Sequence, residues 1–256
     1  MRIVSYNILD GGEGRADPLA EVIEAQHPDI VALIEAQELS VVERIARRLN
    51  MDYVVGAGTS GKASTILSRY PIRDSINHAV LRPAEIPKSF LEVTLQTPEF
   101  GDLPVGVLHL TAGAFEADER AREDEIASIL KLFSRHRNPA RPHLLVGDFN
   151  ANSPLQQIDL ERCKEKTKKA WQANGGNLPR RVVPSLFDIG YTDTLQAFNS
   201  RAAERLTTFT TKDPGQRVDY IFSFGIEPRR IQRAWVETDR LATYASDHYP
   251  ICAEIT

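Results

Sequence analysis

The stretch Ile30-Val31-Ala32-Leu33-Ile34-Glu35 is an unbroken apolar run that ends in a carboxylate. Strands of a parallel sheet that is covered on both faces have such runs, whereas a strand with one face in water alternates. The run therefore predicts a buried strand with Glu35 at the carboxyl edge of its sheet. Asn7 follows the first strand, residues 3–6, in the same way, so the two side chains are expected to lie together. An acid at the start of the next helix is the other interpretation of Glu35.

Short strand-like runs alternate with amphipathic helices along the chain, which indicates an α/β or α+β class. Helices are predicted near residues 17–23, at 39–49 and at about 116–135. Further strands are predicted at residues 53–55, 65–67, 79–81, 90–95, 105–110, 143–146, 207–210, 218–222, 233–237 and 250–255. Since no Gly/Ser linker or low-complexity tract divides the chain, one domain over residues 1–256 is the simplest interpretation.

Composition indicates an ordinary globular enzyme-sized chain, with 42% hydrophobic and 26% charged residues. No apolar run approaches the roughly 18–20 residues that span a bilayer, and a strand begins at the first residues, where a signal peptide would need a basic and an apolar region. A cytoplasmic location without stable membrane association is therefore expected. Cys163 and Cys252 make neither a disulfide framework nor a metal motif. No feature indicates an obligate protein partner.

The formal net charge of −4 argues against broad, non-specific binding of polyanions. It leaves room for a local basic rim, and the densest cationic stretch contains Lys164, Lys166, Lys168 and Lys169. This stretch is interpreted either as the solvated face of a helix or as a lysine-rich flap near a phosphate site.

Oxygen-rich side chains stand at the ends of several other predicted strands. Gly147-Asp148-Phe149-Asn150 offers a carboxylate and an amide oxygen in one extended turn, and both suit Mg²⁺. Asp247 and His248 are adjacent in a turn before the last strand, and a second carboxylate commonly orients such a histidine. Asp219 is the natural candidate for that carboxylate. Asx turns and a salt bridge between Arg217 and Asp219 are the structural alternatives.

Two further residues are candidates with strong structural alternatives. His109 could polarise a phosphate oxygen or protonate a leaving group, although a lone histidine at a strand end is more often structural. Lys62, in a Gly-flanked loop, could contact phosphate or be a solvated loop lysine. The chain contains no P-loop, dinucleotide-binding glycine motif, Gly-x-Ser-x-Gly elbow or zinc-type spacing. The oxygen-rich set favours magnesium or manganese over zinc.

Taken together, these residues resemble the endonuclease/exonuclease/phosphatase superfamily, often called deoxyribonuclease I-like, over essentially the whole chain. The motifs that carry the resemblance follow the family's order and are Ser5-Tyr6-Asn7, Ala32-Leu33-Ile34-Glu35, Leu108-His109-Leu110, Gly147-Asp148-Phe149-Asn150, Arg217-Val218-Asp219-Tyr220-Ile221 and Ser246-Asp247-His248. Each motif could arise by chance, whereas the complete ordered set is not expected to.

The resemblance implies a four-layer αββα sandwich, in which two mixed β-sheets pack face to face with helices outside. It also implies Mg²⁺-dependent hydrolysis of a phosphoester, with Mn²⁺ as an alternative cofactor. The resemblance implies that Asn7, Glu35 and Asp247 bind the metal and that Asp148 activates the attacking water. Asn150 and Lys62 would bind the phosphate, and His109 would support the phosphate or the leaving group. His248, oriented by Asp219, would polarise the phosphate or act as the base.

Two departures from the family pattern concern the substrate. The abasic-site endonuclease branch has an acid two residues after its Asn, where this chain has Leu9 and then Asp10. His109 has no clear acid partner in the loop of residues 61–64.

A nucleic acid or nucleotide-like diester is the favoured substrate. A small phosphorylated metabolite or lipid head group is the alternative, and a catalytically silent binding protein is the remote one.

Overall fold

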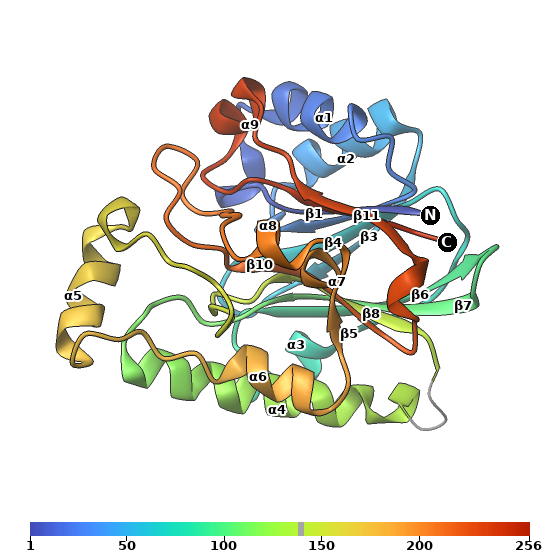
Figure 1. The fold of residues 1–256 in the computed structure, drawn as a ribbon. Coiled ribbons are helices and arrows are strands. Elements are labelled where there is room, and N and C mark those ends of the chain that lie inside the picture. Colours follow the sequence, from blue (N-terminus) through green and yellow to red (C-terminus); the bar gives the residue numbers. More distant parts are fainter. Residues whose placement is uncertain (138–140) are drawn as a thin grey trace.

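The computed structural model describes residues 1–137 and 141–256, and its strands form two six-stranded sheets that pack face to face (Figure 1). The first sheet has the order β11 (Ile231–Val236), β12 (Ile251–Ile255), β1 (Arg2–Asn7), β2 (Ile30–Ile34), β4 (Ala63–Ser68) and β3 (Asp52–Ala57). The second has the order β5 (Ile72–Asn77), β6 (Ser89–Thr97), β7 (Gly101–His109), β8 (His143–Asp148), β10 (Asp219–Phe224) and β9 (Thr192–Asp193).

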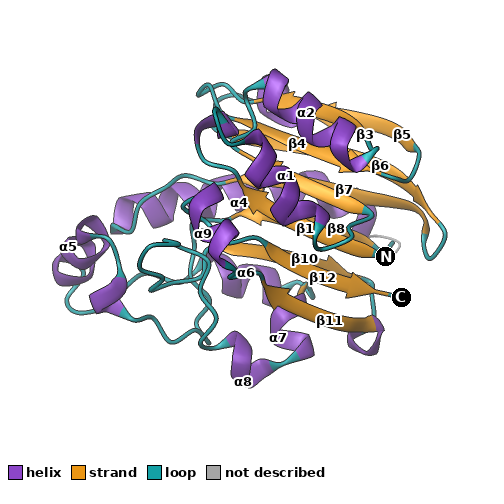
Figure 2. Ribbon diagram, turned by 90° about the horizontal axis from the view of Figure 1, so that it is seen from above, coloured by secondary structure: helices purple, strands orange, loops and turns teal. Residues whose placement is uncertain are grey.

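Helices cover the outer face of each sheet, which completes the expected four-layer αββα sandwich (Figures 1 and 2). The first sheet is covered by α1 (Ala16–Glu24), α2 (Leu39–Leu49) and α9 (Arg240–Ala245). The second is covered by α3 (His78–Leu81), α4 (Glu116–Arg137) and α6 (Val182–Asp188). The remaining helices are α5 (Glu165–Ala173), α7 (Thr194–Phe198), α8 (Ser200–Ala203) and the 3₁₀ turns Asp10–Gly12, Leu160–Arg162 and Pro228–Arg230. In Figure 1, α5 extends from the end of the molecule that is opposite to the chain termini.

The core lies on both faces of the second sheet because side chains alternate along its strands. On β8, Leu144 and Val146 belong to the cluster between the two sheets, whereas Leu145 belongs to the cluster under α4 and α6. Phe133 of α4 is fully buried in that second cluster. Because β8 is buried on both faces, its sequence is a continuous apolar run.

Gly147 allows the two central strands of the second sheet to approach closely. Its φ is 138°, and a Cβ atom there would lie 2.0 Å from the carbonyl oxygen of Leu108. The sequence analysis placed this glycine in a turn, whereas the structure places it inside β8, opposite Leu108 of β7. A side chain at this position would force the strands apart.

Two strand predictions are wrong, and two strands, β5 and the two-residue β9, were missed. Residues 79–81 lie in the helix α3 instead of a strand, and Val80 and Leu81 of this apolar run are exposed. Residues 207–210 form no strand, because their backbone pairing is limited to isolated bridges of Phe209 with Gln216 and with His248. The strand β5 was missed because it is a polar edge strand with an exposed centre.

Among the residues that the structure describes, no helix combines the length and the apolar character needed to cross a bilayer.

Candidate active site

The topology brings polar side chains from both sheets to one edge. Each sheet contains one parallel pair, β1–β2 and β7–β8, and antiparallel strands flank each pair. Strands β1, β2, β7 and β8 end at this edge, and β4, β6, β10 and β12 begin there, because antiparallel neighbours run the opposite way. The residues that follow or precede these strands therefore face one another across the sandwich.

Asp148, the last residue of β8, lies at the centre of the site. Its Oδ2 accepts a hydrogen bond from Asn7 Nδ2 at 3.1 Å and lies 3.5 Å from His109 Nε2 and 3.8 Å from His248 Nε2. Its Oδ1 accepts the backbone N–H of Asn150 at 2.9 Å. The side chain is almost fully buried. One carboxylate thus joins groups from β1, β7, β8 and the loop before β12.

Asp219 holds His248 on the other side of Asp148. His248 Nδ1 lies 2.9 Å from Asp219 Oδ2, so the imidazole donates to that carboxylate and its Nε2 faces Asp148. Burial alone would lower the pKa of His248, but the carboxylates of Asp219, Asp148 and Asp247 outweigh it and raise the pKa to about 9. The imidazole is therefore a cationic donor at neutral pH. Arg217, considered above as a partner of Asp219, instead pairs with Asp193 at 2.7 Å.

Glu35 lies just past β2, beside two groups from neighbouring loops. Its Oε2 accepts hydrogen bonds from Lys62 Nζ at 2.7 Å and from the backbone N–H of Asp10 at 3.0 Å. Burial opposes ionisation, but these bonds lower the pKa of Glu35 below its usual value. The carboxylate of Asp10 also pairs with Lys62. Lys62 therefore contacts two carboxylates, and Asp10 reaches the cluster although it stands one position later than the family pattern.

Asn7 links the Glu35 cluster to Asp148. Its Nδ2 lies 3.1 Å from Asp148 Oδ2 and 3.5 Å from Glu35 Oε1, whereas its Oδ1 accepts the N–H of Leu9. In this arrangement the amide nitrogen, rather than the oxygen, faces the carboxylates. The loop that carries His248 is fixed to the same strand, because Ser246 Oγ donates to the carbonyl of Asn7 at 2.7 Å.

Asp247 and Asn150 border the centre of the site. Asp247 Oδ1 lies 3.9 Å from His248 Nε2, and its Oδ2 lies 3.4 Å from Lys164 Nζ. Asn150 donates through Nδ2 to the carbonyl of Leu110 at 3.1 Å. Three residues of the site have left-handed backbone conformations, Asp10 with φ 46°, Glu35 with φ 59° and Asn150 with φ 47°.

Lys88, which the sequence analysis did not single out, lies in the floor of the site. Its Nζ lies 2.8 Å from Nε2 of His109, whose own Nδ1 has no hydrogen-bond partner in the described part of the chain. Burial, which the attraction of Asp148 does not offset, lowers the pKa of His109 to about 3. Burial also lowers the pKa of Lys88. His109 is thus neutral at neutral pH. Besides Asp148, its polar neighbour is Lys88, and no acid from the loop of residues 61–64 contacts it in the described structure.

Replacing Lys88 with Met is expected to lower kcat/KM for a phosphodiester by about 10²-fold, because one polar donor next to Asp148 and His109 is lost. The change keeps the length of the side chain. Steady-state kinetics on the purified variant would measure the effect, with Lys131→Met, at an exposed position of α4, as the matched control. Equal kinetics for the two variants would show that Lys88 has no part in turnover.

Lys62 and Lys88 occupy equivalent positions in the sequence relative to the strands that follow them. Each stands one residue before an antiparallel strand, β4 or β6, and that strand pairs with a strand that carries a site residue. A residue at the start of such a strand must lie beside the end of its neighbour. Once the pairing is known, the position of Lys88 beside His109 follows, but the sequence alone does not give the pairing.

The donor set at this edge fits a divalent cation. Carboxylates are ligands that suit Mg²⁺, and Glu35, Asp10 and Asp148 supply three of them at this edge, with Asn7 between Glu35 and Asp148. Among the described residues, the group of acidic and histidine side chains whose potential ligand atoms all lie within 4.8 Å of one another is the buried group of Asp148, Asp219 and His248. This group mixes oxygen with nitrogen, and its Asp219–His248 pair is already hydrogen-bonded.

Solved structures confirm the fold over the whole chain. The 3′ phosphatase NExo from Neisseria, bound to product DNA hairpin, is 19% identical, with a TM-score of 0.77 and coverage of 100% of this chain and 99% of that chain. An AP endonuclease from Archaeoglobus fulgidus is 17% identical, with a TM-score of 0.73 and the same coverage. The human Nocturnin catalytic domain is 17% identical, with a TM-score of 0.65 and coverage of 100% and 94%. A search of curated protein sequences gave no match.

The family model that matches the chain and the fold are those of phosphoester hydrolases. More particularly, the chain belongs to the Endonuclease/Exonuclease/phosphatase family, whose model matches residues 4–248. The match begins in β1 and ends at His248, so it contains every site residue described above.

Proposed function

We propose that this protein is a Mg²⁺-dependent phosphodiester hydrolase, able to use Mn²⁺, that acts on a nucleic acid or a nucleotide-type diester. The observation that carries the proposal is the position of Asp148, within 3.8 Å of Asn7, His109 and His248 at the edge where the two sheets meet. Since the groups come from both sheets, residues 1–256 would act as one catalytic domain.

In this proposal Asp148 orients the attacking water and accepts its proton, because its carboxylate is buried and fixed by donors on both oxygens. His248, held by Asp219, donates through Nε2 to a phosphate oxygen. Asn150 and Lys62 bind further phosphate oxygens. His109 supports the phosphate or the leaving group as a neutral imidazole. Each of these residues acts on the charge that develops in the transition state.

Glu35, Asn7 and Asp247 would hold the cation, with Asp10 beside them. A divalent cation at this position supplies charge neutralisation for the phosphate and for the departing oxygen. Lys62 contacts Glu35 and Asp10 in this structure, so it would share these carboxylates with the cation.

A small phosphorylated molecule or a lipid head group is the second candidate substrate. The net charge of −4 favours it, because a long polyanion would meet repulsion from the surface as a whole. A monoester and a diester of the same leaving group separate this candidate from the first.

The proposal is tested by incubating the protein with a model diester, a model monoester, supercoiled plasmid and a single-stranded oligonucleotide, each with Mg²⁺, Mn²⁺ or EDTA. We expect hydrolysis of the diester and of at least one nucleic acid with either metal, and turnover at background with EDTA. Cleavage of the model diester with both nucleic acids intact would support the small-molecule candidate. Turnover that persists in EDTA would contradict metal dependence.

A further inference from the structure

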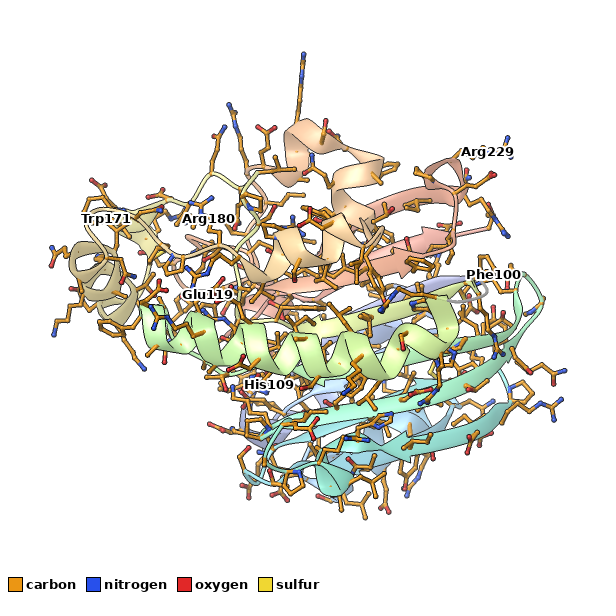
Figure 3. All side chains as sticks on the ribbon, turned by 90° about the horizontal axis from the view of Figure 1, so that it is seen from below. Phe100, His109, Glu119, Trp171, Arg180 and Arg229 are labelled. Atoms are coloured by element: carbon orange, nitrogen blue, oxygen red, sulfur yellow. The ribbon has the colours of Figure 1, made fainter. Side chains whose placement is uncertain are left out.

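A pocket of about 200 Å³ lies beside the reaction centre, and of the residues that line it only Asn150 has a role in the proposed reaction. Its walls come from the loop after β7, the segment after Asp148, the start of α5 and the segment before β10. Figure 3 shows Trp171 of α5, Arg180 and Glu119 toward this end of the molecule, with Phe100 and Arg229 at the other end. Asn150 belongs both to the pocket and to the site.

The wall formed by the start of α5 is positively charged. Lys164 and Lys166 both line the pocket, and α5 begins between them at Glu165. The first N–H groups of a helix have no acceptor within the helix, and the helix dipole adds partial positive charge there. The side chains and the backbone of this turn therefore favour the same kind of ligand, an anion.

Two buried polar side chains that face the pocket indicate a ligand independently of α5's charge. Gln216 is 8% exposed and Thr167 is 7% exposed, and both line the pocket. Within residues 1–137 and 141–256, the hydrogen bonds of Gln216 and Thr167 are made by their backbone groups, and neither side chain makes one. Their polar atoms are not among the solvent-inaccessible atoms that lack a partner in the described chain, so both remain open to the pocket. A ligand that enters the pocket can therefore form hydrogen bonds with this amide and this hydroxyl.

Arg122 also lines the pocket, but its guanidinium is already engaged. It pairs with Glu119 at 2.7 Å and donates to the carbonyls of Thr111 and Gly113 at 2.9 and 2.7 Å. Since these contacts fix the loop after β7, Arg122 shapes the wall. Of the two lysines of the α5 turn, Lys164 pairs with Asp247, so Lys166 is the one without an ion-pair partner among the described residues.

The pocket borders the reaction centre at Phe209 and Asn150. The ring of Phe209 lies 4.6 Å from that of His248, and Lys164 Nζ lies 4.2 Å from the Phe209 centroid. Lys164 Nζ is also 3.4 Å from Asp247 Oδ2. A phosphate held by His248 and Asn150 would therefore lie next to the pocket.

From this arrangement we propose that the pocket binds a second anionic group of the substrate, a phosphate one unit away from the scissile phosphate. Lys166, the first turn of α5, Gln216 and Thr167 would contact it. The inference rests on the proposed function and adds a substrate class. The enzyme would prefer a short oligonucleotide or a nucleotide that carries a further phosphate over an isolated diester.

The test compares the dinucleotide TpT with pTpT and TpTp, which carry one further phosphate at the 5′ or the 3′ end. For the wild type we expect a KM at least roughly tenfold lower for one of the two phosphorylated forms, the loss of one charge-assisted contact being of that order. Lys166→Ala and Gln216→Ala should each remove most of this advantage and leave TpT hydrolysis unchanged. Lys169→Ala, an exposed position of the same helix outside the pocket, is the matched control.

A wild type that does not distinguish the three dinucleotides would overturn the inference, as would Lys166→Ala raising KM equally for all of them. If the wild type hydrolyses no diester at all, the proposed function fails, and the pocket is still tested by binding. Calorimetry with thymidine 3′,5′-bisphosphate should then show binding that Lys166→Ala weakens by roughly tenfold and Lys169→Ala does not. Equal binding to the two variants would refute the pocket as an anion site.

Discussion

Replacing Asp148 with Asn is expected to lower kcat by about 10³-fold or more for any phosphodiester that the wild type hydrolyses. The amide cannot take a proton from water, and it puts a donor where Asn7, His109 and His248 now face an acceptor. Because the replacement keeps the shape of the side chain, the fold should survive. Turnover under single-turnover conditions would measure the change in the chemical step.

Thermal unfolding of the Asp148→Asn variant separates chemistry from stability. Asp188→Asn, on an exposed carboxylate at the end of α6, is the matched control and should keep wild-type turnover. If the Asp148→Asn variant is folded and retains more than a tenth of wild-type kcat, Asp148 does not activate the water.

Replacing His248 with Ala is expected to lower kcat by about 10³-fold, because the donor that faces the phosphate is removed. Asp219→Asn should have a smaller effect, about 10–10²-fold, since it leaves the imidazole present but loses the carboxylate that orients it at 2.9 Å. The double variant should be no worse than His248→Ala alone. The three rate constants, measured on one diester, form a double-mutant cycle.

Tyr244→Ala is the control for this series, because Tyr244 is 70% exposed on α9 just before the loop that carries His248. Effects of Asp219→Asn and His248→Ala that multiply would show that the two residues act separately. Added imidazole should restore part of the turnover of His248→Ala and leave that of Asp219→Asn unchanged.

The sequence predicts the strands that end at the site because their apolar runs stop at a polar residue. The strands β1, β2, β7 and β8 were all expected, each within a few residues of its bounds. The family motifs then place Asn7, Glu35, His109 and Asp148 at one edge, and the structure brings these four together. Local pattern is sufficient for these residues since each strand end is marked by a change from apolar to polar side chains.

The residues that the sequence did not indicate depend on pairing between distant strands. Lys88 precedes β6, and its position beside His109 follows only from the register that pairs Ser89 with His109. Asp10 reaches Glu35 through a left-handed turn, with φ 46° at Asp10 itself, which no spacing rule predicts. Gln216 precedes the predicted strand at residues 218–222. Its position next to the site follows from Phe209, which forms isolated bridges with both Gln216 and His248.

The left-handed conformations at Glu35 and Asn150 set a limit on how this protein could be made more robust. A backbone that favours glycine is strained when it carries a larger side chain, by about 1–3 kcal/mol in such sites. Glycine at position 35 would relieve that strain and would also remove the carboxylate that meets Lys62. Selection or design for thermal tolerance would therefore favour, at these two positions, residues that abolish the chemistry. Gains in robustness without loss of turnover have to be sought away from this edge of the sheets.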